Sequence, residues 1–250
     1  MMPKKNKAMP SVEELVSTIK RSSLPTVVIE GSDDVVVFRG LEEVYYDCGL
    51  SILPAGGRNN VLQLFSRRNE FLEKLVVFVV DKDEWILNEI PAEYVNERLI
   101  CTDGYSIEND IYVDGGLERL MSPDERARFK EELEVFLRWY ALAINRALQP
   151  PGGEEYKCHP NVILDDALER ERRMTLDNGE NFPEDLHARI SEGYSKILRG
   201  KSLMALLTRQ LSYKGRPVRH NHLQLMETIS CQRGPLINRI YLEVASVVAA

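Results

Sequence analysis

The clearest indication of the fold class is the stretch LVVFVVDKDEW, residues 75–85. Six apolar residues run without a break from Leu75 to Val80, and two aspartates follow at Asp81 and Asp83. A strand that is apolar on both faces is typical of a parallel sheet that helices cover on both sides. The stretch therefore predicts a fully buried strand whose carboxyl end carries acidic side chains.

The segments around this strand extend the pattern to an α/β fold. Apolar runs at 27–29, 51–54 and 98–102 predict three more strands. Helices are predicted at 11–22, after Asp33 and Asp34, at 61–75 with Asn59 or Asn60 as its cap, and at 91–97. This alternation predicts a parallel sheet flanked by helices.

The second half of the chain is predicted to be mostly helical. Ser122-Pro123-Asp124-Glu125 is a strong helix start, because it combines a cap, a first-turn proline and a capping-box glutamate. The sequence thus predicts an N-terminal tail and helix (1–24), an α/β domain (25–113) and a helical C-terminal region (114–250). The further helices are predicted at 165–173, 184–198, 201–213, 219–231 and 235–248.

Charge is unevenly distributed along the chain. The net charge is -7, but residues 196–239 hold nine basic side chains and one acidic one, Glu227. This segment is therefore +8 and the rest of the chain -15. The segment either binds the phosphates of a nucleic acid or consists of ordinary solvent-exposed helix faces.

The sequence gives no sign of a membrane or secreted protein. No apolar run approaches the roughly 20 residues that a membrane span needs. The N-terminal stretch MMPKKNKAMP is basic but lacks the apolar region of a secretory signal. We therefore expect a cytoplasmic protein that does not contact a membrane.

The acidic residues at the strand ends predict a metal site. Glu30 ends the first strand, and Asp81 and Asp83 end the third. Ligands of open parallel sheets bind at the carboxyl ends of the strands, and side chains two residues apart share a face if the strand geometry persists. If the first and third strands are neighbours, three carboxylates converge and repel one another unless a cation lies among them. Mg²⁺, or Mn²⁺ in its place, suits such hard oxygen ligands.

At this point the sequence resembles a known family. VVIEGSDDVVVFRGL followed by FVVDKDEW is similar to the Toprim domain, the metal-binding fold of bacterial-type primases, type IA and II topoisomerases and OLD-family nucleases. PAGGRNNV, GYSIENDIY and LRGKSLMALLTRQL further resemble the Toprim effector of the PARIS anti-phage system. The resemblance implies a Toprim-like fold and a toxic nuclease, with tRNA or DNA as substrate, that an ABC-type ATPase partner holds inactive.

The resemblance also implies roles for single residues. Glu30 would be a metal ligand or general base, and Asp81 and Asp83 metal ligands. Asp34 and Glu108 would be further acidic residues of the metal site, and Lys201 would stabilise the phosphate in the transition state. We expect the basic segment to contact nucleic acid through Arg199, Lys201, Arg209, Lys214, Arg216 and Arg219.

Other functions remain open or are disfavoured. A non-catalytic subunit that docks on an ATPase is the main alternative. A receiver-like or dehalogenase-like phosphotransferase needs Asp where the first strand ends in Glu30. Gly200-Lys201-Ser202 is no ATP-binding loop, because Ser195 stands where that motif needs glycine. The apolar face of 235–248 could pair two copies into a homodimer.

Overall fold

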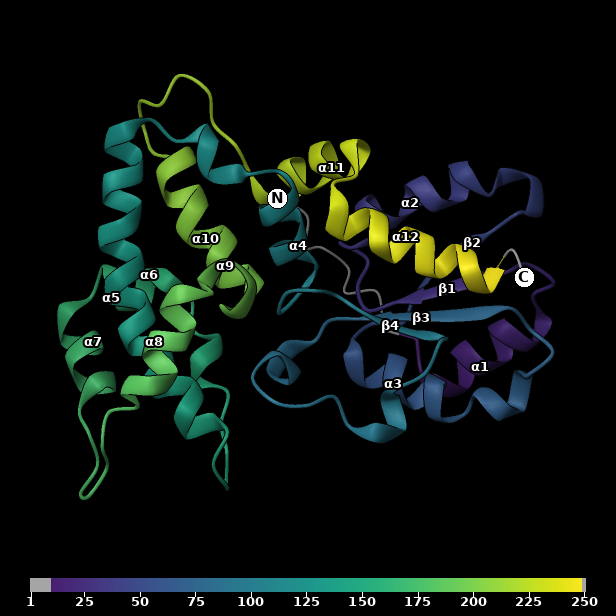
Figure 1. Cartoon of the computed structure of the whole chain (residues 1–250), viewed down its shortest axis with the longest axis horizontal. Helices are drawn as coiled ribbons and strands as arrows, with labels where there is room; N and C mark the ends of the chain where they lie inside the picture. Colours follow the sequence, from purple (N-terminus) through teal and green to yellow (C-terminus); the bar gives the residue numbers. More distant parts are fainter. Residues whose placement is uncertain (1–9, 249–250) are drawn as a thin grey trace, which may run out of the picture. The chain divides into compact units, whose positions relative to one another are not determined.

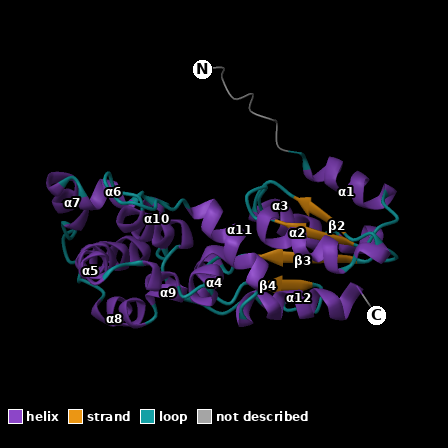
Figure 2. Cartoon of the chain, turned by 90° about the horizontal axis from the view of Figure 1, so that it is seen from above, coloured by secondary structure: helices purple, strands orange, loops and turns teal. Residues whose placement is uncertain are grey.

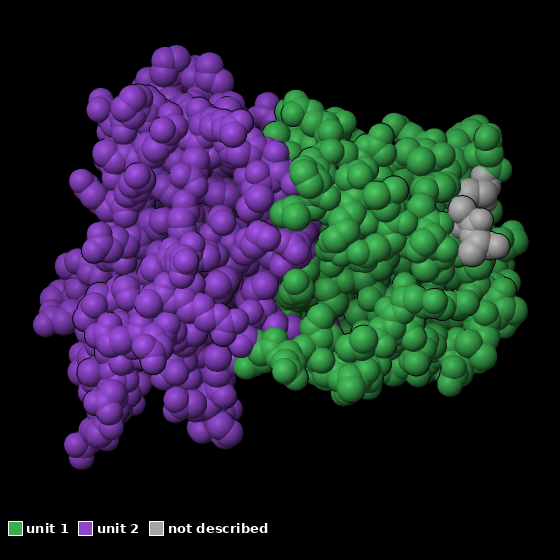
Figure 3. Space-filling model, viewed as in Figure 1, with its two compact units in different colours: residues 1–82, 88–102, 227–250 green, residues 83–87, 103–226 purple. Residues whose placement is uncertain are grey.

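The computed structural model describes residues 10–248, which form two compact units (Figure 3). Unit 1 contains the residues up to Lys82, Asn88–Thr102 and the residues from Glu227 onward. Unit 2 contains Asp83–Leu87 and Asp103–Met226. This division differs from the boundary predicted at residue 113, because the last helix of the chain belongs to the sheet. Residues 1–9, where a signal was sought, lie outside the described part.

Unit 1 is built on a four-stranded parallel sheet in the order β2-β1-β3-β4 (Figure 2). The predicted α/β fold with a parallel sheet and flanking helices is confirmed. The first and third strands are neighbours, as the predicted metal site requires. The strands are β1 (Thr26–Ile29), β2 (Ser51–Pro54), β3 (Val76–Val80) and β4 (Leu99–Cys101).

The two central strands are buried at every position. Val27 of β1 pairs with Ile52 on one side and with Val77 on the other. Burying one such valine or phenylalanine side chain stabilises the fold by about 1.5–3 kcal/mol. This burial explains the unbroken apolar run, and it fixes where β1 and β3 end.

Helices cover both faces of the sheet (Figure 1). One face carries α2 (Val35–Val44) and α12 (Pro235–Val248), and the other carries α1 (Val12–Arg21) and α3 (Arg58–Ser66). Phe65 of α3 meets Phe78 of β3 edge-to-face, with ring centroids 5.5 Å apart.

The apolar face of α12 is used inside unit 1. Ile237, Ile240 and Val244 are fully buried, and the helix packs on β3 and β4. The face that was expected to pair two copies is therefore already covered by the sheet of the same chain.

The structure changes two helix predictions in unit 1. Helix α3 begins at Arg58 without a side-chain cap, and Asn60 donates to the Ala55 carbonyl from within the helix. The helix also ends at Ser66, and a 3₁₀ turn follows. At 91–97 the structure has only a short 3₁₀ turn. The 3₁₀ turns of unit 1 are Tyr46–Cys48, Arg68–Phe71 and Ala92–Tyr94.

Unit 2 is helical. Its longest helix starts at the predicted signal, since the Ser122 hydroxyl accepts from Glu125 and the Glu125 carboxylate accepts from Ser122. The helix predicted at 184–198 is split at Gly193. The helices are α4 (Ile107–Asp114), α5 (Pro123–Ala147), α6 (Pro160–Leu164), α7 (Ala167–Met174), α8 (Glu184–Glu192), α9 (Tyr194–Ile197), α10 (Gly200–Leu211) and α11 (His222–Gln232), whose last residues belong to unit 1.

The core of unit 2 lies between α5 and α10. Trp139 and Tyr140 of α5 and Leu203 and Leu207 of α10 are buried. Among residues 10–248, none of the helices has the length and apolarity needed to cross a membrane.

Candidate functional site

The carboxyl ends of β1 and β3 bring two acidic residues together. Glu30 follows β1 directly, and Asp81 follows β3 directly. The Oε1 atom of Glu30 accepts a hydrogen bond from the main-chain N–H of Asp81 at 2.8 Å. Both residues are half-buried. The first two of the predicted ligands therefore meet at the predicted edge of the sheet.

The main chain of Glu30 is held by the glycine turn after β2. The Glu30 carbonyl accepts from the N–H groups of Gly56 and Gly57 at 2.9 and 2.8 Å. Gly57 has φ 134° and ψ 160°, a conformation that is essentially restricted to glycine. The turn predicted from AGGRNNV thus fixes the backbone that carries the Glu30 carboxylate.

Asp34 supports the loop between β1 and α2. It is the N-terminal boundary residue of α2, and its Oδ2 atom accepts from the N–H of Gly31 at 2.9 Å. The bond closes the loop that begins at Glu30. The expected role of Asp34 at the metal site stays a prediction.

Asp83 does not continue the strand. β3 ends at Val80, and Asp83 begins a 3₁₀ turn (Asp83–Ile86) with φ 47°. The expectation that Asp81 and Asp83 share a face through strand alternation is wrong, because that alternation needs extended backbone. The Asp83 N–H donates to the Tyr105 carbonyl at 2.8 Å, and both residues belong to unit 2.

The rest of the segment Asp83–Leu87 is also anchored within unit 2. The Tyr156 hydroxyl donates to the Glu84 carboxylate. Burial raises the pKa of Tyr156, and the charge of Glu84 adds to this rise. Arg189 donates to the carbonyls of Ile86 and Leu87 at 3.1 and 3.3 Å. The backbone position of Asp83 is thus set by the helical unit.

Glu108 lies in a buried polar cluster at the start of α4. It is 6% exposed, and its carboxylate accepts from the Ser106 hydroxyl. The amide of Asn109 donates to the carbonyls of Ser195 and Leu198 at 2.8 and 2.9 Å. These bonds give Glu108 and its neighbours a structural task, and the role of Glu108 as a metal ligand stays a prediction.

Asp110 completes this cluster. Its carboxylate is fully buried and accepts from the N–H groups of Asp103 and Gly104 at 2.9 and 2.7 Å. No role was predicted for Asp110 from the sequence. Its signal was present in IEND, where consecutive polar residues stand among apolar ones.

The basic segment is partly neutralised within unit 2. Arg209 forms ion pairs with Glu132 of α5 and with Asp165, each at 2.8 Å. Arg216 pairs with Glu125 of α5 at 2.9 Å. These two of the six residues predicted to bind nucleic acid therefore balance nearby carboxylates.

The other four residues predicted to bind nucleic acid differ in their exposure to solvent and in their contacts. Lys201, in the first turn of α10, and Lys214 and Arg219, between α10 and α11, are exposed. Arg199 donates to the Lys157 carbonyl at 3.4 Å. The charge available to a phosphate on unit 2 is therefore smaller than the sequence total of the segment indicates.

One basic residue at the sheet edge was missed. Arg58, the first residue of α3, donates from Nη2 to the Lys82 carbonyl at 3.2 Å. Lys82 directly follows Asp81. The signal was the arginine that comes immediately after Gly56-Gly57, at the carboxyl end of β2.

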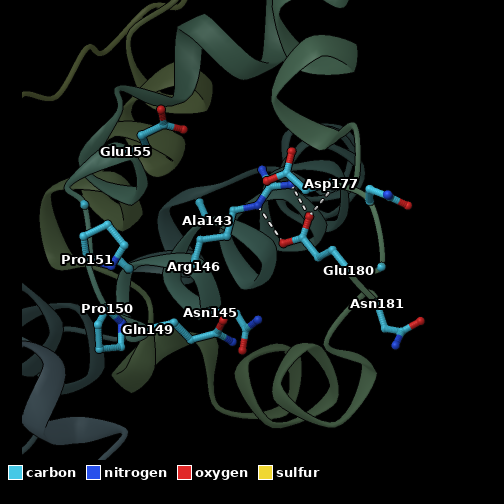
Figure 4. A pocket seen from close by; sticks show the side chains of 15 residues that line it. Ala143, Asn145, Arg146, Gln149, Pro150, Pro151, Glu155, Asp177, Glu180 and Asn181 are labelled. Atoms are coloured by element: carbon cyan, nitrogen blue, oxygen red, sulfur yellow. Dashed lines mark hydrogen bonds and ion pairs between the residues drawn. The ribbon is translucent and has the colours of Figure 1, made fainter.

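A cavity of about 750 Å³ lies elsewhere, at the end of α5 (Figure 4). It contains none of the predicted site residues. Arg146 of α5 donates hydrogen bonds from Nε and Nη2 to the Glu180 carboxylate, at 2.8 and 2.5 Å. Its Nη1 atom donates to the Arg173 carbonyl. The ion pair between Arg146 and Glu180 holds the loop at 177–181 against the end of α5.

A Mg²⁺ site at the sheet edge stays a prediction. Within residues 10–248, no group of three or more His, Cys, Asp or Glu side chains is arranged as a metal site. Mg²⁺, however, binds proteins through one or two carboxylates and keeps several waters or substrate oxygens. Glu30 and Asp81 supply two such carboxylates on neighbouring strands.

Neither a protein-family model nor a curated protein sequence matches this chain. The resemblance to Toprim nucleases therefore stays a prediction from the sequence.

Proposed function

We propose that this protein is a metal-dependent nuclease that hydrolyses phosphodiester bonds at the carboxyl edge of its sheet. The observation that carries the proposal is the contact between the Glu30 carboxylate and the main chain of Asp81. The contact brings two acidic residues, each directly following one of two adjacent buried strands, to the same edge of the sheet. Such clustering is costly in free energy unless a cation or a reaction uses it.

The residues would divide the chemistry as follows. Asp81 would hold a Mg²⁺ ion, with Glu30 either as a second ligand or as the general base; the bound ion would supply charge neutralisation at the phosphate and a lowered pKa of a bound water. Attack of the water oxygen forms one P–O bond as the bond to the leaving oxygen breaks. As the general base, Glu30 would accept the proton of the water, and the leaving oxygen would take a proton from solvent. Asp34 would keep Glu30 in place through the loop that it closes. Asp83 remains a proposed third ligand.

The biological setting is supported by the sequence resemblance alone. By analogy with the PARIS effectors, we propose a cytoplasmic toxin with tRNA as its substrate class. An ABC-type ATPase would hold it inactive until infection. The proposed Lys201 contact to the phosphate belongs to the same analogy.

Cleavage assays with matched variants test the proposal. Purified protein is incubated with tRNA, single-stranded RNA and plasmid DNA, in Mg²⁺, Mn²⁺ or EDTA. Glu30→Gln is the key variant, because its amide oxygen can still accept from Asp81. Glu42→Gln is the matched control, since Glu42 likewise accepts a strand N–H, that of Ile52, at 3.2 Å.

We expect metal-dependent cleavage by the wild type and by Glu42→Gln, and none by Glu30→Gln. Cleavage that persists in Glu30→Gln would overturn the site. Absence of cleavage by the wild type on every substrate would overturn the nuclease and favour the docking subunit.

A further inference from the structure

The segment Asp81-Lys82 is held at both ends by charged side chains of unit 1. Glu30 accepts from its first N–H at 2.8 Å, and Arg58 donates to its last carbonyl at 3.2 Å. A carboxylate and a guanidinium therefore contact two adjacent residues after the carboxyl end of β3; the carboxylate contacts Asp81 and the guanidinium contacts Lys82. Arg58 is half-buried, so its charge is only partly screened by solvent.

The charge balance of the proposed reaction calls for cations at this place. The carboxylates of Glu30, Asp34 and Asp81 and one substrate phosphodiester carry four negative charges. One Mg²⁺ neutralises two of them. Arg58 and Lys82 bring two positive charges to the same edge and offset the other two, and the proposed third ligand, Asp83, would add one further negative charge.

Arg239 is a third basic residue close to the end of the sheet. Arg239 donates to the carbonyl of Cys101, the last residue of β4, at 2.8 Å, but also pairs with Glu243 at 2.9 Å. Burial raises the pKa of the Cys101 thiol, and the charges of Lys82, Arg58 and Arg239 oppose this rise. The positive charges thus converge on the ends of β3 and β4.

We propose that Arg58 is a catalytic residue that binds the phosphate of the nucleic-acid substrate, with Lys82 beside it. A guanidinium presents its N–H donors in a plane that matches the oxygens of a phosphate, and it stays charged at every working pH. This inference rests on the proposed nuclease function. It assigns to unit 1 the phosphate contact that the sequence resemblance gives to Lys201.

The competing explanation is that Arg58 only fastens α3 to the end of β3. Two variants separate these roles. Arg58→Met keeps an unbranched side chain but removes the charge and the hydrogen-bond donors. Arg58→Lys keeps the charge but lacks the planar guanidinium group. Arg68→Met is the matched control, because Arg68 also donates to a carbonyl of unit 1, that of Phe65, at 3.0 Å, and follows the far end of α3.

Four readouts are measured on the full chain. They are single-turnover cleavage of the substrate identified above, binding of that substrate with Ca²⁺ in place of Mg²⁺, affinity for Mn²⁺, and the unfolding temperature. We expect Arg58→Met to lower cleavage by about 100-fold or more, as for the loss of one charge-stabilising donor. It should also weaken substrate binding, leave Mn²⁺ affinity within about threefold, and unfold at nearly the wild-type temperature. Arg58→Lys should recover part of the loss, and Arg68→Met should match the wild type.

Two results would overturn the inference while the proposed function stands. In one, Arg58→Met cleaves and binds like the wild type while Glu30→Gln is inactive. In the other, Arg58→Met and Arg58→Lys lose Mn²⁺ binding and thermal stability together, which would mean that Arg58 only holds α3 against the end of β3. If the wild type cleaves nothing, the proposed function fails and the inference falls with it.

Discussion

Two sets of acidic residues in this protein look alike in sequence and differ in structure. Glu30 and Asp81 stand at the edge of the sheet, half-buried and close to each other. Glu108 and Asp110 stand at the start of α4, where they are 6% and 0% exposed. In the first set, the Glu30 carboxylate accepts a hydrogen bond from the main-chain N–H of Asp81. The second set is embedded in a network with hydroxyl and main-chain donors.

The difference suits the two sets of carboxylates to different roles. A buried carboxylate with two main-chain donors is satisfied by the protein and stabilises a loop. A carboxylate at a solvent-accessible strand end, beside a second one, is placed for a ligand. We therefore expect substitutions at α4 to cost stability, and substitutions at the sheet edge to cost activity.

The largest effect is expected at Asp110. Asp110→Ala leaves the N–H groups of Asp103 and Gly104 buried without their acceptor. Hydrogen bonds to a charged group contribute about 1.5–3 kcal/mol each, so the free energy of unfolding should fall by about 3–5 kcal/mol. Urea unfolding followed by circular dichroism measures this loss. A loss below about 1 kcal/mol would remove the distinction between the two sets.

Gly200→Ala tests how tightly the α4 cluster is packed. A Cβ atom at Gly200 would lie 2.0 Å from the Ser106 hydroxyl oxygen and 2.9 Å from Cβ of Glu108. Overpacking of this kind costs about 1–3 kcal/mol. Gly153→Ala is the control, since a Cβ there meets no atom within 4 Å. Equal unfolding midpoints for the two variants would contradict the packing described for α4.

A further carboxylate, that of Glu125, extends the comparison to pH. The hydrogen bond from Arg216 and the capping bond to Ser122 hold the pKa of Glu125 at about 2, below its ordinary value of 4.5. A lowered pKa means that the contribution of Glu125 is complete above about pH 4.5 and is lost as the pH falls towards 2. The difference in unfolding temperature between wild type and Glu125→Gln should therefore shrink between pH 5 and pH 2.5. A difference that stays constant over this range would refute the role of the pair.

The smallest stability effect is expected at Glu30. In Glu30→Gln the side-chain oxygen still accepts from Asp81, and one of two neighbouring negative charges is removed. The free energy of unfolding should stay within about 1 kcal/mol of the wild type, because partly exposed charges contribute little. Thermal unfolding of the two proteins without metal measures this. A loss of several kcal/mol would mean that Glu30 is structural, as Asp110 is.

The sequence predicted most of unit 1 because its signals are local. The apolar runs ending at Ile29 and Val80 can be read from neighbouring residues, and so can the glycine turn at Gly56-Gly57. Strand adjacency follows from general rules of parallel sheets. The contact of Glu30 with Asp81 followed from these signals, as the carboxyl ends of adjacent parallel strands share one edge.

The rest depended on long-range pairing that no local pattern reveals. The left-handed conformation of Asp83 is fixed by Tyr105, which lies 22 residues further along the chain. The neutralised charge of Arg209 depends on Glu132, 77 residues away. The return of α12 to the sheet likewise joins distant parts of the chain.

The most direct test of the comparison is Mn²⁺ binding, measured by electron paramagnetic resonance on wild type, Glu30→Gln and Glu108→Gln. If the sheet edge holds the metal, Glu30→Gln lowers the affinity at least tenfold, and Glu108→Gln stays within about threefold of the wild type, as partial loss of one carboxylate ligand implies. Unchanged affinity in Glu30→Gln together with lost affinity in Glu108→Gln would contradict the account and place the metal at α4.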